Sequence, residues 1–286
     1  MTLPDIRADA NLCPTPVWSQ GMYPVLFHLG GVAVPTHDFF TALGMLVAGA
    51  WVLFESRRRG MADRSMATIA AGALVGAGLG ARLGNWWIYL TSGGSLTLPG
   101  MLVDSGKSVL GGLTGAYIGV LVTKRLIRYP YKTGDVFAPA AALGIAIGRV
   151  GCFLTEQPGT VTTAPWGFTP PPETLMNIPN CPQCQPGVAM HPSFLYEIGF
   201  FLALFAVLMW LRPRLLEHPG ELFKVFLAAY VVFRFGIEFV RGNPVVGLGL
   251  TRSQWFLLAT GPLIAWYFVR QVRSGVYRPE KQESPT

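Results

Sequence analysis

Charged residues are scarce in this sequence: Asp, Glu, Lys and Arg make up 13% of its 286 residues, against about 25% in an ordinary soluble protein. Hydrophobic residues make up 51%, and the mean hydropathy is +0.42. This composition excludes an ordinary soluble domain and indicates a membrane protein. The first 22 residues have no apolar stretch after a basic start, so we expect no signal peptide there. The sequence also lacks a linker or a second soluble domain.

Seven apolar segments are close to the ~20 helical residues needed to cross the hydrocarbon layer. They lie at residues 37–54, 66–90, 108–123, 134–154, 192–211, 222–240 and 253–270. The sequence therefore predicts an all-α polytopic membrane protein of about seven transmembrane helices, with residues 1–286 in one domain. The longest loop, 155–191, contains eight prolines and is expected to form an extracytoplasmic cap.

The basic residues predict the orientation. Of the 22 Lys and Arg residues, 15 fall in the segments 57–64, 124–132, 212–224 and 270–281, which seven spans place on one side. An excess of Lys and Arg marks the cytoplasmic side. The N-terminus is then outside and the C-terminus inside, and the net charge of +7 indicates topology rather than nucleic-acid binding.

Three arginines break this pattern because they lie within apolar segments. Arg82, Arg149 and Arg234 are 12 to 16 residues past the cytoplasmic start of their helices. At 1.5 Å per residue they share a depth roughly 18–24 Å above the inner face. A buried guanidinium costs at least ~2.5–3.5 kcal/mol in a membrane, so three at one level need a negative partner.

Two interpretations of these arginines are open. One is an internal salt-bridge network, in which Glu238 pairs with Arg234 and either Glu156 or Glu197 pairs with another arginine. The other is a site for an anionic group, most simply a lipid phosphate, whose oxygens match the planar guanidinium fork. Gly111 and Gly112, at the outer end of the third helix, could add backbone N–H groups that face the anion.

Small residues recur at helical spacing in the second and third helices. They are Gly72, Gly76, Gly80 and Gly84 in one helix and Gly111, Gly115 and Gly119 in the other. Such faces let helix backbones approach closely in lipid. We expect the two helices to pack backbone to backbone.

Histidines lie at two predicted helix starts. His191 precedes the fifth helix, with Tyr196 and Glu197 a turn later, and either caps that helix or acts as a general base. His37 and Asp38 open the first helix, where they either face a cavity or mark the membrane interface.

Cys181 and Cys184 form a CxxC pair in the outer loop, where disulfides form. A local disulfide is one interpretation. A zinc site completed by Cys152 and His191 is the other.

Four motifs resemble those of the bacterial prolipoprotein diacylglyceryl transferases. They are GARLG at 80–84, GRVGCFL at 148–154, HPSFLYE at 191–197 and FRFGIEFVR at 233–241. Their order and spacing agree with the family over roughly residues 23–270. The resemblance implies transfer of a diacylglyceryl group from phosphatidylglycerol to the lipobox cysteine of an exported prolipoprotein, with glycerol phosphate leaving. It also implies lipoprotein biosynthesis at the bacterial plasma (inner) membrane.

The sequence departs from the family at several positions. The family's catalytic histidine, which precedes a Gly-Gly pair, is Leu110 here. The asparagine of its GRxGNF signature is Cys152, a second asparagine is Thr155, and the tyrosine expected early in the first helix is His37. The acceptor thiol must then be deprotonated by another group: His37, His191 or a carboxylate.

The predicted site combines these residues. The resemblance makes Arg149 and Arg234 the essential pair, and His191 and His37 are the candidate bases. The predicted substrate-binding residues are Arg82, Gly111, Gly112, Glu156, Tyr196, Glu197, Glu238 and Arg241. The expected partners are phosphatidylglycerol, a prolipoprotein signal peptide with its lipobox, and membrane lipids, without nucleic acid, cofactor or metal. The alternatives are a non-catalytic phospholipid-binding protein or a paralogue with another acceptor.

Overall fold

Seven long helices dominate the computed structural model, which describes residues 22–61, 64–91, 97, 108–178, 181, 184–215 and 218–273. The helices are α1 (Thr36–Arg58), α2 (Arg64–Thr91), α3 (Val109–Leu126), α4 (Gly134–Thr155), α5 (Ser193–Leu215), α6 (Glu221–Ile237) and α7 (Arg252–Arg273). Each predicted apolar segment forms a helix, with ends shifted by four residues at most.

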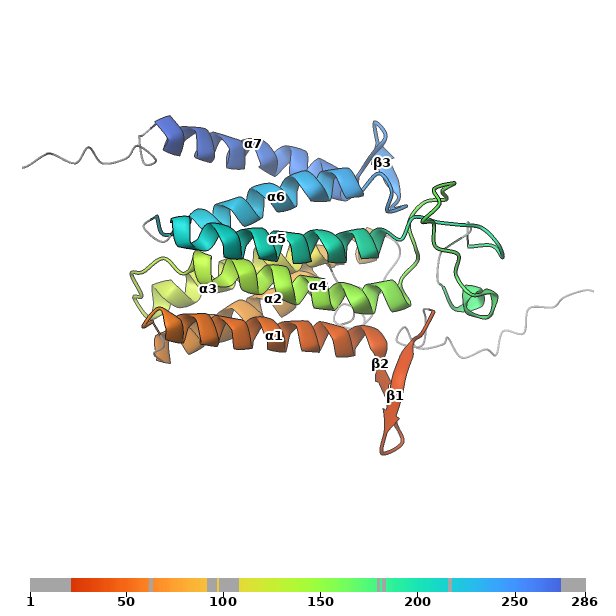
Figure 1. Ribbon diagram of the computed structural model, residues 1–286, viewed down its shortest axis with the longest axis horizontal. Coiled ribbons are helices and arrows are strands. Elements are labelled where there is room, and N and C mark those ends of the chain that lie inside the picture. The colour runs from red at the N-terminus through yellow and green to blue at the C-terminus, as the bar shows by residue number, and fades with distance from the viewer. Residues whose placement is uncertain are drawn as a thin grey trace, which may run out of the picture.

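Two short antiparallel hairpins, which the sequence analysis did not predict, flank the helices. Strand β1 (Val25–Leu29) pairs with β2 (Val32–Pro35) just before α1, and β3 (Val245–Gly247) pairs with β4 (Leu250–Thr251) between α6 and α7. The outer loop contains a short 3-10 helix, Pro172–Asn177. In Figure 1 both hairpins and the described part of this loop lie at one end of the bundle, away from the α1–α2 and α3–α4 connections.

Four helices are long and apolar enough to cross a membrane: α1, α2 as far as Trp86, α4 and α5. Their outward faces carry large apolar side chains, such as Leu46 at 71% exposed and Val75 at 62%. A soluble protein rarely exposes apolar surface of this extent, whereas lipid solvates it. The membrane class is confirmed, while the seven spans and the cap remain predictions.

The glycines of α2 and α3 bring these helices into backbone contact. A Cβ added at Gly76 would lie 2.2 Å from the carbonyl oxygen of Gly115, and one added at Gly80 would lie 2.3 Å from that of Gly111. No larger side chain fits such a contact without moving a backbone. The predicted small-residue interface is confirmed.

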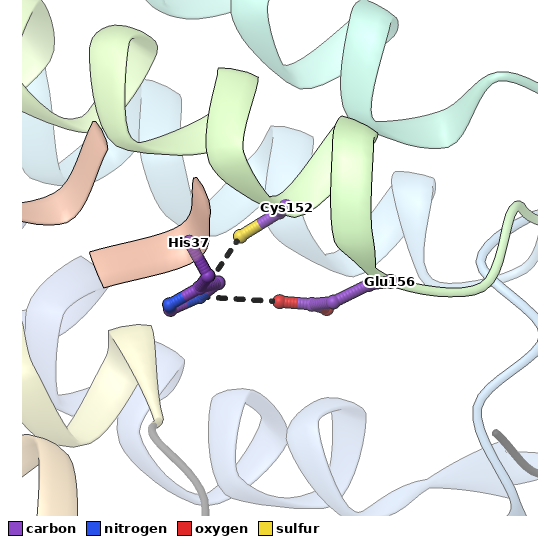
Figure 2. A group of neighbouring side chains, drawn as sticks. All are labelled: His37, Cys152 and Glu156. Atoms are coloured by element: carbon purple, nitrogen blue, oxygen red, sulfur yellow. Dashed lines mark hydrogen bonds and ion pairs between the residues drawn. The ribbon is translucent and has the colours of Figure 1, made fainter. Parts of the chain in front are cut away.

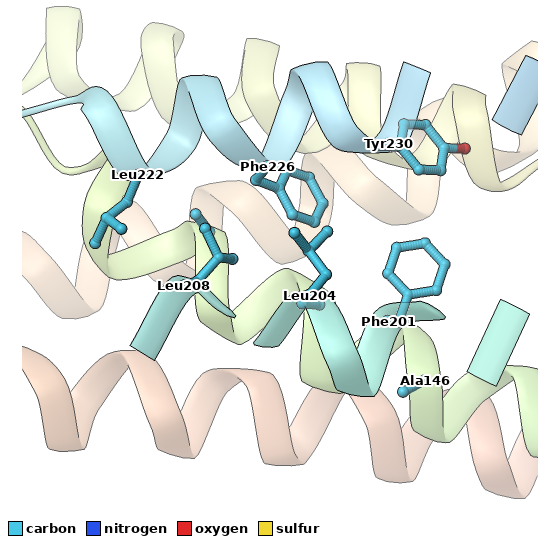
Figure 3. Packing of buried hydrophobic residues seen from close by; sticks show 9 residues of the cluster. Ala146, Phe201, Leu204, Leu208, Leu222, Phe226 and Tyr230 are labelled. Atoms are coloured by element: carbon cyan, nitrogen blue, oxygen red, sulfur yellow. The ribbon is translucent and has the colours of Figure 1, made fainter. Parts of the chain in front are cut away.

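A shared apolar core joins α4, α5 and α6 (Figure 3). Small side chains on α4 (Ala138, Ala142 and Ala146) leave room for larger ones on α5 (Phe201, Leu204 and Leu208) and α6 (Leu222, Phe226 and Tyr230). Leu110 of α3 packs against this core. The core fixes the positions of α4, α5 and α6 relative to one another. It ends about one helical turn before Arg149 on α4 and Arg234 on α6.

Candidate active site

Glu197 on α5 is the centre of the arginine cluster. Its side chain is only 1% exposed. Arg149 Nε from α4 contacts one carboxylate oxygen, and Arg241 Nη1, from the segment that follows α6, contacts the other. Arg234 Nη1 of α6 lies 3.9 Å from that second oxygen. Two of the three arginines predicted at one depth, Arg149 and Arg234, therefore meet at a single buried carboxylate.

Two further carboxylates complete the cluster. Glu238 Oε2 lies 2.8 Å from Arg234 Nη1, as the one-turn spacing predicted. Glu156 Oε2 lies 3.5 Å from Arg241 Nη2. The salt-bridge interpretation is thus correct for the contacts that the structure describes, with three guanidinium groups facing three carboxylates.

The salt bridges do not use all the hydrogen-bonding capacity of the arginines. Each guanidinium carries five N–H donors, whereas the described carboxylate contacts reach Arg149 through Nε and Arg234 through Nη1. Phe194 lies beside two of the arginines, with its ring centroid 5.6 Å from Arg149 Cζ and 4.8 Å from Arg241 Cζ. The cluster therefore presents buried cationic donors against an aromatic wall.

A second group of side chains adjoins the arginines. Figure 2 shows His37 of α1 beside Cys152 and Glu156 at the end of α4. His37 Nε2 lies 3.7 Å from Cys152 Sγ and 3.6 Å from Glu156 Oε1. Arg149 Nη1 lies 3.6 Å from the same sulfur. We name His37, Cys152 and Glu156 the His37 cluster.

Glycine positions this cluster by allowing α1 to approach α4. A Cβ added at Gly151 would lie 3.2 Å from His37 Cα, and one added at Gly44 would lie 2.4 Å from the carbonyl oxygen of Gly144. Because the two helices are this close, the first turn of α1 delivers His37 directly to Cys152 in the last turn of α4. His37 therefore faces Cys152 and Glu156, and the two interpretations of it, a cavity or the membrane interface, remain predictions.

Glu156 is ionised at neutral pH. Desolvation raises the pKa of this carboxyl, whose side chain is 40% exposed, but its contact with His37 and the guanidinium groups of Arg241 and Arg149 outweigh desolvation and hold the pKa well below its usual range. Its two oxygens have different neighbours, since Oε1 faces His37 and Oε2 faces Arg241. The carboxylate thus links the His37 cluster to the arginine cluster.

His191 joins the outer loop to the start of α5. Its carbonyl oxygen accepts hydrogen bonds from Gly159 and Ser193, each at 2.8 Å. Its Nδ1 lies 3.2 Å from the hydroxyl of Tyr196, which accepts a hydrogen bond from Trp166 Nε1 at 2.8 Å. These contacts tie His191 to the outer loop and to the first turn of α5, while a capping role of its side chain remains a prediction. A catalytic role for His191 and a binding role for Tyr196 remain predictions.

The anion-binding role predicted for Gly111 and Gly112 needs correction. The N–H of Gly111 donates to Ser108 Oγ at 3.1 Å, and the N–H of Gly112 donates to the Ser108 carbonyl at 2.8 Å. Since both N–H groups have partners within the helix cap, they do not face an anion in this conformation.

Arg82 lies half-buried on α2, next to Ala81, whose carbonyl accepts a hydrogen bond from Ser108 N at 2.9 Å. Its predicted substrate contact remains a prediction.

Cys181 and Cys184 form a disulfide, as predicted. The zinc site proposed for them with Cys152 and His191 is wrong, because their sulfurs are bonded to each other. Cys152 is a free, buried thiol.

Sequence reasoning treated His37 and Cys152 as separate departures from the family pattern and missed that they touch. The signal was present in the sequence, because both departures introduce side chains with nucleophilic or metal-binding atoms. Only the α1–α4 contact, which joins positions 115 residues apart, shows that they form one unit. Asn243, which donates to Glu238 Oε1 at 2.6 Å, and Ser253, which accepts from Arg234 Nη2 at 3.3 Å, were also missed.

The fold and the site define an integral membrane protein whose helices enclose buried arginines, carboxylates and a thiol. The family model for prolipoprotein diacylglyceryl transferase matches residues 24–270, and the chain belongs to this family. The phosphatidylglycerol–prolipoprotein diacylglyceryl transferase of Cupriavidus pinatubonensis is 30% identical over 278 residues, covering 90% of this chain and 95% of that protein. Its counterpart in Geobacter sulfurreducens is 35% identical over 237 residues, covering 79% and 85%. The predicted class, a transferase of lipoprotein biosynthesis, is confirmed.

Proposed function

We propose that this protein transfers the diacylglyceryl group of phosphatidylglycerol to the lipobox cysteine thiol of an exported prolipoprotein. The names of its relatives support both substrates. The observation that carries the proposal is the meeting of Arg149, Arg234 and Arg241 around one buried carboxylate. We place the protein in the bacterial inner membrane, N-terminus outside, with its seven helices as spans and loop 155–191 as an outer cap.

The arginines act on the phosphate. Arg149 and Arg234 hold its oxygens with donors that the carboxylates leave free, and Arg82 approaches from α2. The acceptor thiolate attacks the glyceryl carbon, a C–S bond forms, and the C–O bond breaks with its electron pair leaving on glycerol phosphate. Positive charge fixed beside the leaving group stabilises the transition state, because it needs no reorganisation during the reaction.

The acceptor thiol must lose its proton, since an ordinary thiol is only a few per cent thiolate at neutral pH. Leu110, at the usual histidine position, packs in an apolar environment and offers no base. We assign activation of the thiol to His37, which lies between a thiol and a carboxylate next to the arginine cluster. His191 and Tyr196 then hold the outer loop over the acceptor peptide.

A direct assay tests this function. Purified protein is incubated with phosphatidylglycerol vesicles and a lipobox peptide, and mass spectrometry detects the thioether adduct. We expect Arg149→Ala and Arg234→Ala to abolish transfer, and Arg→Lys at either position to be poor, because an ammonium cannot form the bidentate contact.

Arg212→Ala is the matched control. Arg212 Nη2 also pairs with a buried glutamate, Glu55, at 2.7 Å, but this pair lies in the cytoplasmic half predicted from the basic residues. We expect this variant to keep its transfer activity. Near-normal activity in Arg149→Ala or Arg234→Ala would show that the arginine is structural and that the phosphate site is misplaced.

Leu110, which stands at the usual position of the catalytic histidine, favours a second function. This alternative is phospholipid binding without catalysis, on the same scaffold. The same assay separates the two. Stoichiometric binding of phosphatidylglycerol with no consumption, across several acceptor peptides, establishes the binding protein. Transfer to an acceptor other than a lipobox thiol establishes a paralogue.

A further inference from the structure

The His37 cluster has the spacing of a metal site. The ligand atoms His37 Nε2, Cys152 Sγ and a Glu156 oxygen all lie within 4.8 Å of one another. The 3.6 Å between Nε2 and Oε1 is too long for a hydrogen bond between nitrogen and oxygen. The contacts that link the group without a metal are the ion pair between His37 and Glu156 and the longer sulfur contact between His37 and Cys152.

Tetrahedral zinc is also compatible with the spacing of this group. With a Zn–N bond near 2.0 Å, a Zn–O bond near 2.1 Å and a Zn–S bond near 2.3 Å, neighbouring ligand atoms are separated by about 3.4 Å for N and O and about 3.6 Å for N and S. The observed separations are 3.6 Å between His37 Nε2 and Glu156 Oε1 and 3.7 Å between His37 Nε2 and Cys152 Sγ. Both separations from His37 Nε2 thus match tetrahedral zinc within a few tenths of an ångström, and the third pair, Cys152 Sγ and the Glu156 oxygen, lies within 4.8 Å.

The surroundings suit a bound cation. Asp38 Oδ1 forms an ion pair with His37 Nδ1 at 3.6 Å, on the ring edge opposite the proposed ligand atom, and a shift of about half an ångström would let it orient a zinc-binding histidine by a hydrogen bond. Arg241 holds the second oxygen of Glu156, so that the first oxygen is free to bind metal. Arg149 Nη1, 3.6 Å from Cys152 Sγ, can donate to a metal-bound thiolate.

One side of the cluster is open. Cys152 is 6% exposed, but the side chains of His37 and Glu156 are 27% and 40% exposed. Three protein ligands and one accessible position are the arrangement of a catalytic rather than a structural zinc site.

We propose that His37, Cys152 and Glu156 bind one zinc ion, and that the fourth position binds the acceptor thiol as a thiolate. This inference rests on the proposed function and deepens it, and it departs from the expectation of no metal. The thiol gives its proton to solvent when it binds, since a metal-bound thiol is deprotonated. Its sulfur then forms the C–S bond as the glyceryl C–O bond breaks, and the ion remains in its divalent state. The metal would supply the thiol activation that Leu110 cannot.

The test measures metal first and activity second. Full-length protein in detergent is stripped with a chelator, loaded with Zn²⁺ alone, and assayed for bound zinc by elemental mass spectrometry. We expect one ion per chain, and at least tenfold weaker binding in His37→Gln, Cys152→Ser and Glu156→Gln. His28→Gln, at an exposed histidine of β1, is the control and should bind zinc normally.

Cobalt provides a second readout that requires no activity. Co²⁺-loaded protein should show the near-ultraviolet band of a cobalt–thiolate bond, and Cys152→Ser should lose the band while still eluting as folded protein. Zinc binding that all three substitutions leave unchanged overturns the site. So does a Co²⁺ spectrum without the thiolate band.

The transfer assay separates this inference from the proposed function. Transfer that is lost in chelator-treated protein and restored by Zn²⁺ supports both. Full transfer by metal-free protein overturns the zinc site and leaves the proposed function intact. Stoichiometric zinc on these three residues without any transfer supports the site and counts against the proposed function.

Discussion

Replacing Glu197 by Gln tests the centre of the site most directly. Among the three arginines around this carboxylate, Arg234 retains Glu238 and Arg241 retains Glu156 after the change. Arg149, only 4% exposed, is the one whose described carboxylate contact is removed. The perturbation therefore amounts to one uncompensated buried charge rather than three.

The expected loss of stability follows from this one uncompensated charge. Two opposite charges ~4 Å apart attract by ~4 kcal/mol at an effective dielectric constant near 20, and breaking one buried pair costs about 3–5 kcal/mol. We expect Glu197→Gln to lower the melting temperature of the detergent-solubilised protein by on the order of 10 °C. The assay is the fraction that remains monodisperse on size exclusion after heating.

A double variant separates charge from packing. Removing both partners, Arg149→Gln with Glu197→Gln, leaves no unpaired buried charge, so we expect much of the stability to return. Transfer of the diacylglyceryl group should stay absent in both variants, because Arg149 is proposed to hold the phosphate. A Glu197→Gln protein that melts within ~2 °C of the parent would refute the reasoning, as would one whose loss the double variant does not restore.

Three further predictions concern the helix contact, the topology and the candidate base. Gly115→Ala should destabilise the protein by about 1–3 kcal/mol, because its Cβ would lie 2.1 Å from the Gly76 carbonyl oxygen. Gly78→Ala is the control: it has open space around it and should have the melting temperature of the parent. Single cysteines introduced at Arg58 and Gly94, the latter outside the described residues, should react with impermeant reagents from opposite faces of the membrane; labelling from one face contradicts the seven-span topology. His37→Ala should lower turnover at least tenfold while phosphatidylglycerol binding changes little, and normal turnover in this variant would remove His37 from thiol activation.

The sequence alone determined the seven helices and the partner of one arginine, Arg234. Apolar segments of ~20 residues must form helices in lipid, because every backbone polar group needs an internal hydrogen bond there. The spacing of Arg234 and Glu238 places them one turn apart on the same helix, so their ion pair followed from local geometry. The glycine repeats of α2 and α3 predicted their close contact for the same reason.

Only the tertiary structure decided which distant side chains share a site. Nothing in the spacing of His37 and Cys152 indicates that they meet, since their contact depends on the approach of α1 to α4 through Gly44, Gly144 and Gly151. The free N–H groups expected at the start of α3 were wrong for a related reason. Ser108, the first residue of the predicted segment, lies just before α3 and caps them, and the identity of a capping partner is settled by backbone geometry rather than by helical periodicity. Periodicity fixes the face on which a residue lies, whereas helix packing selects the partner that the face meets.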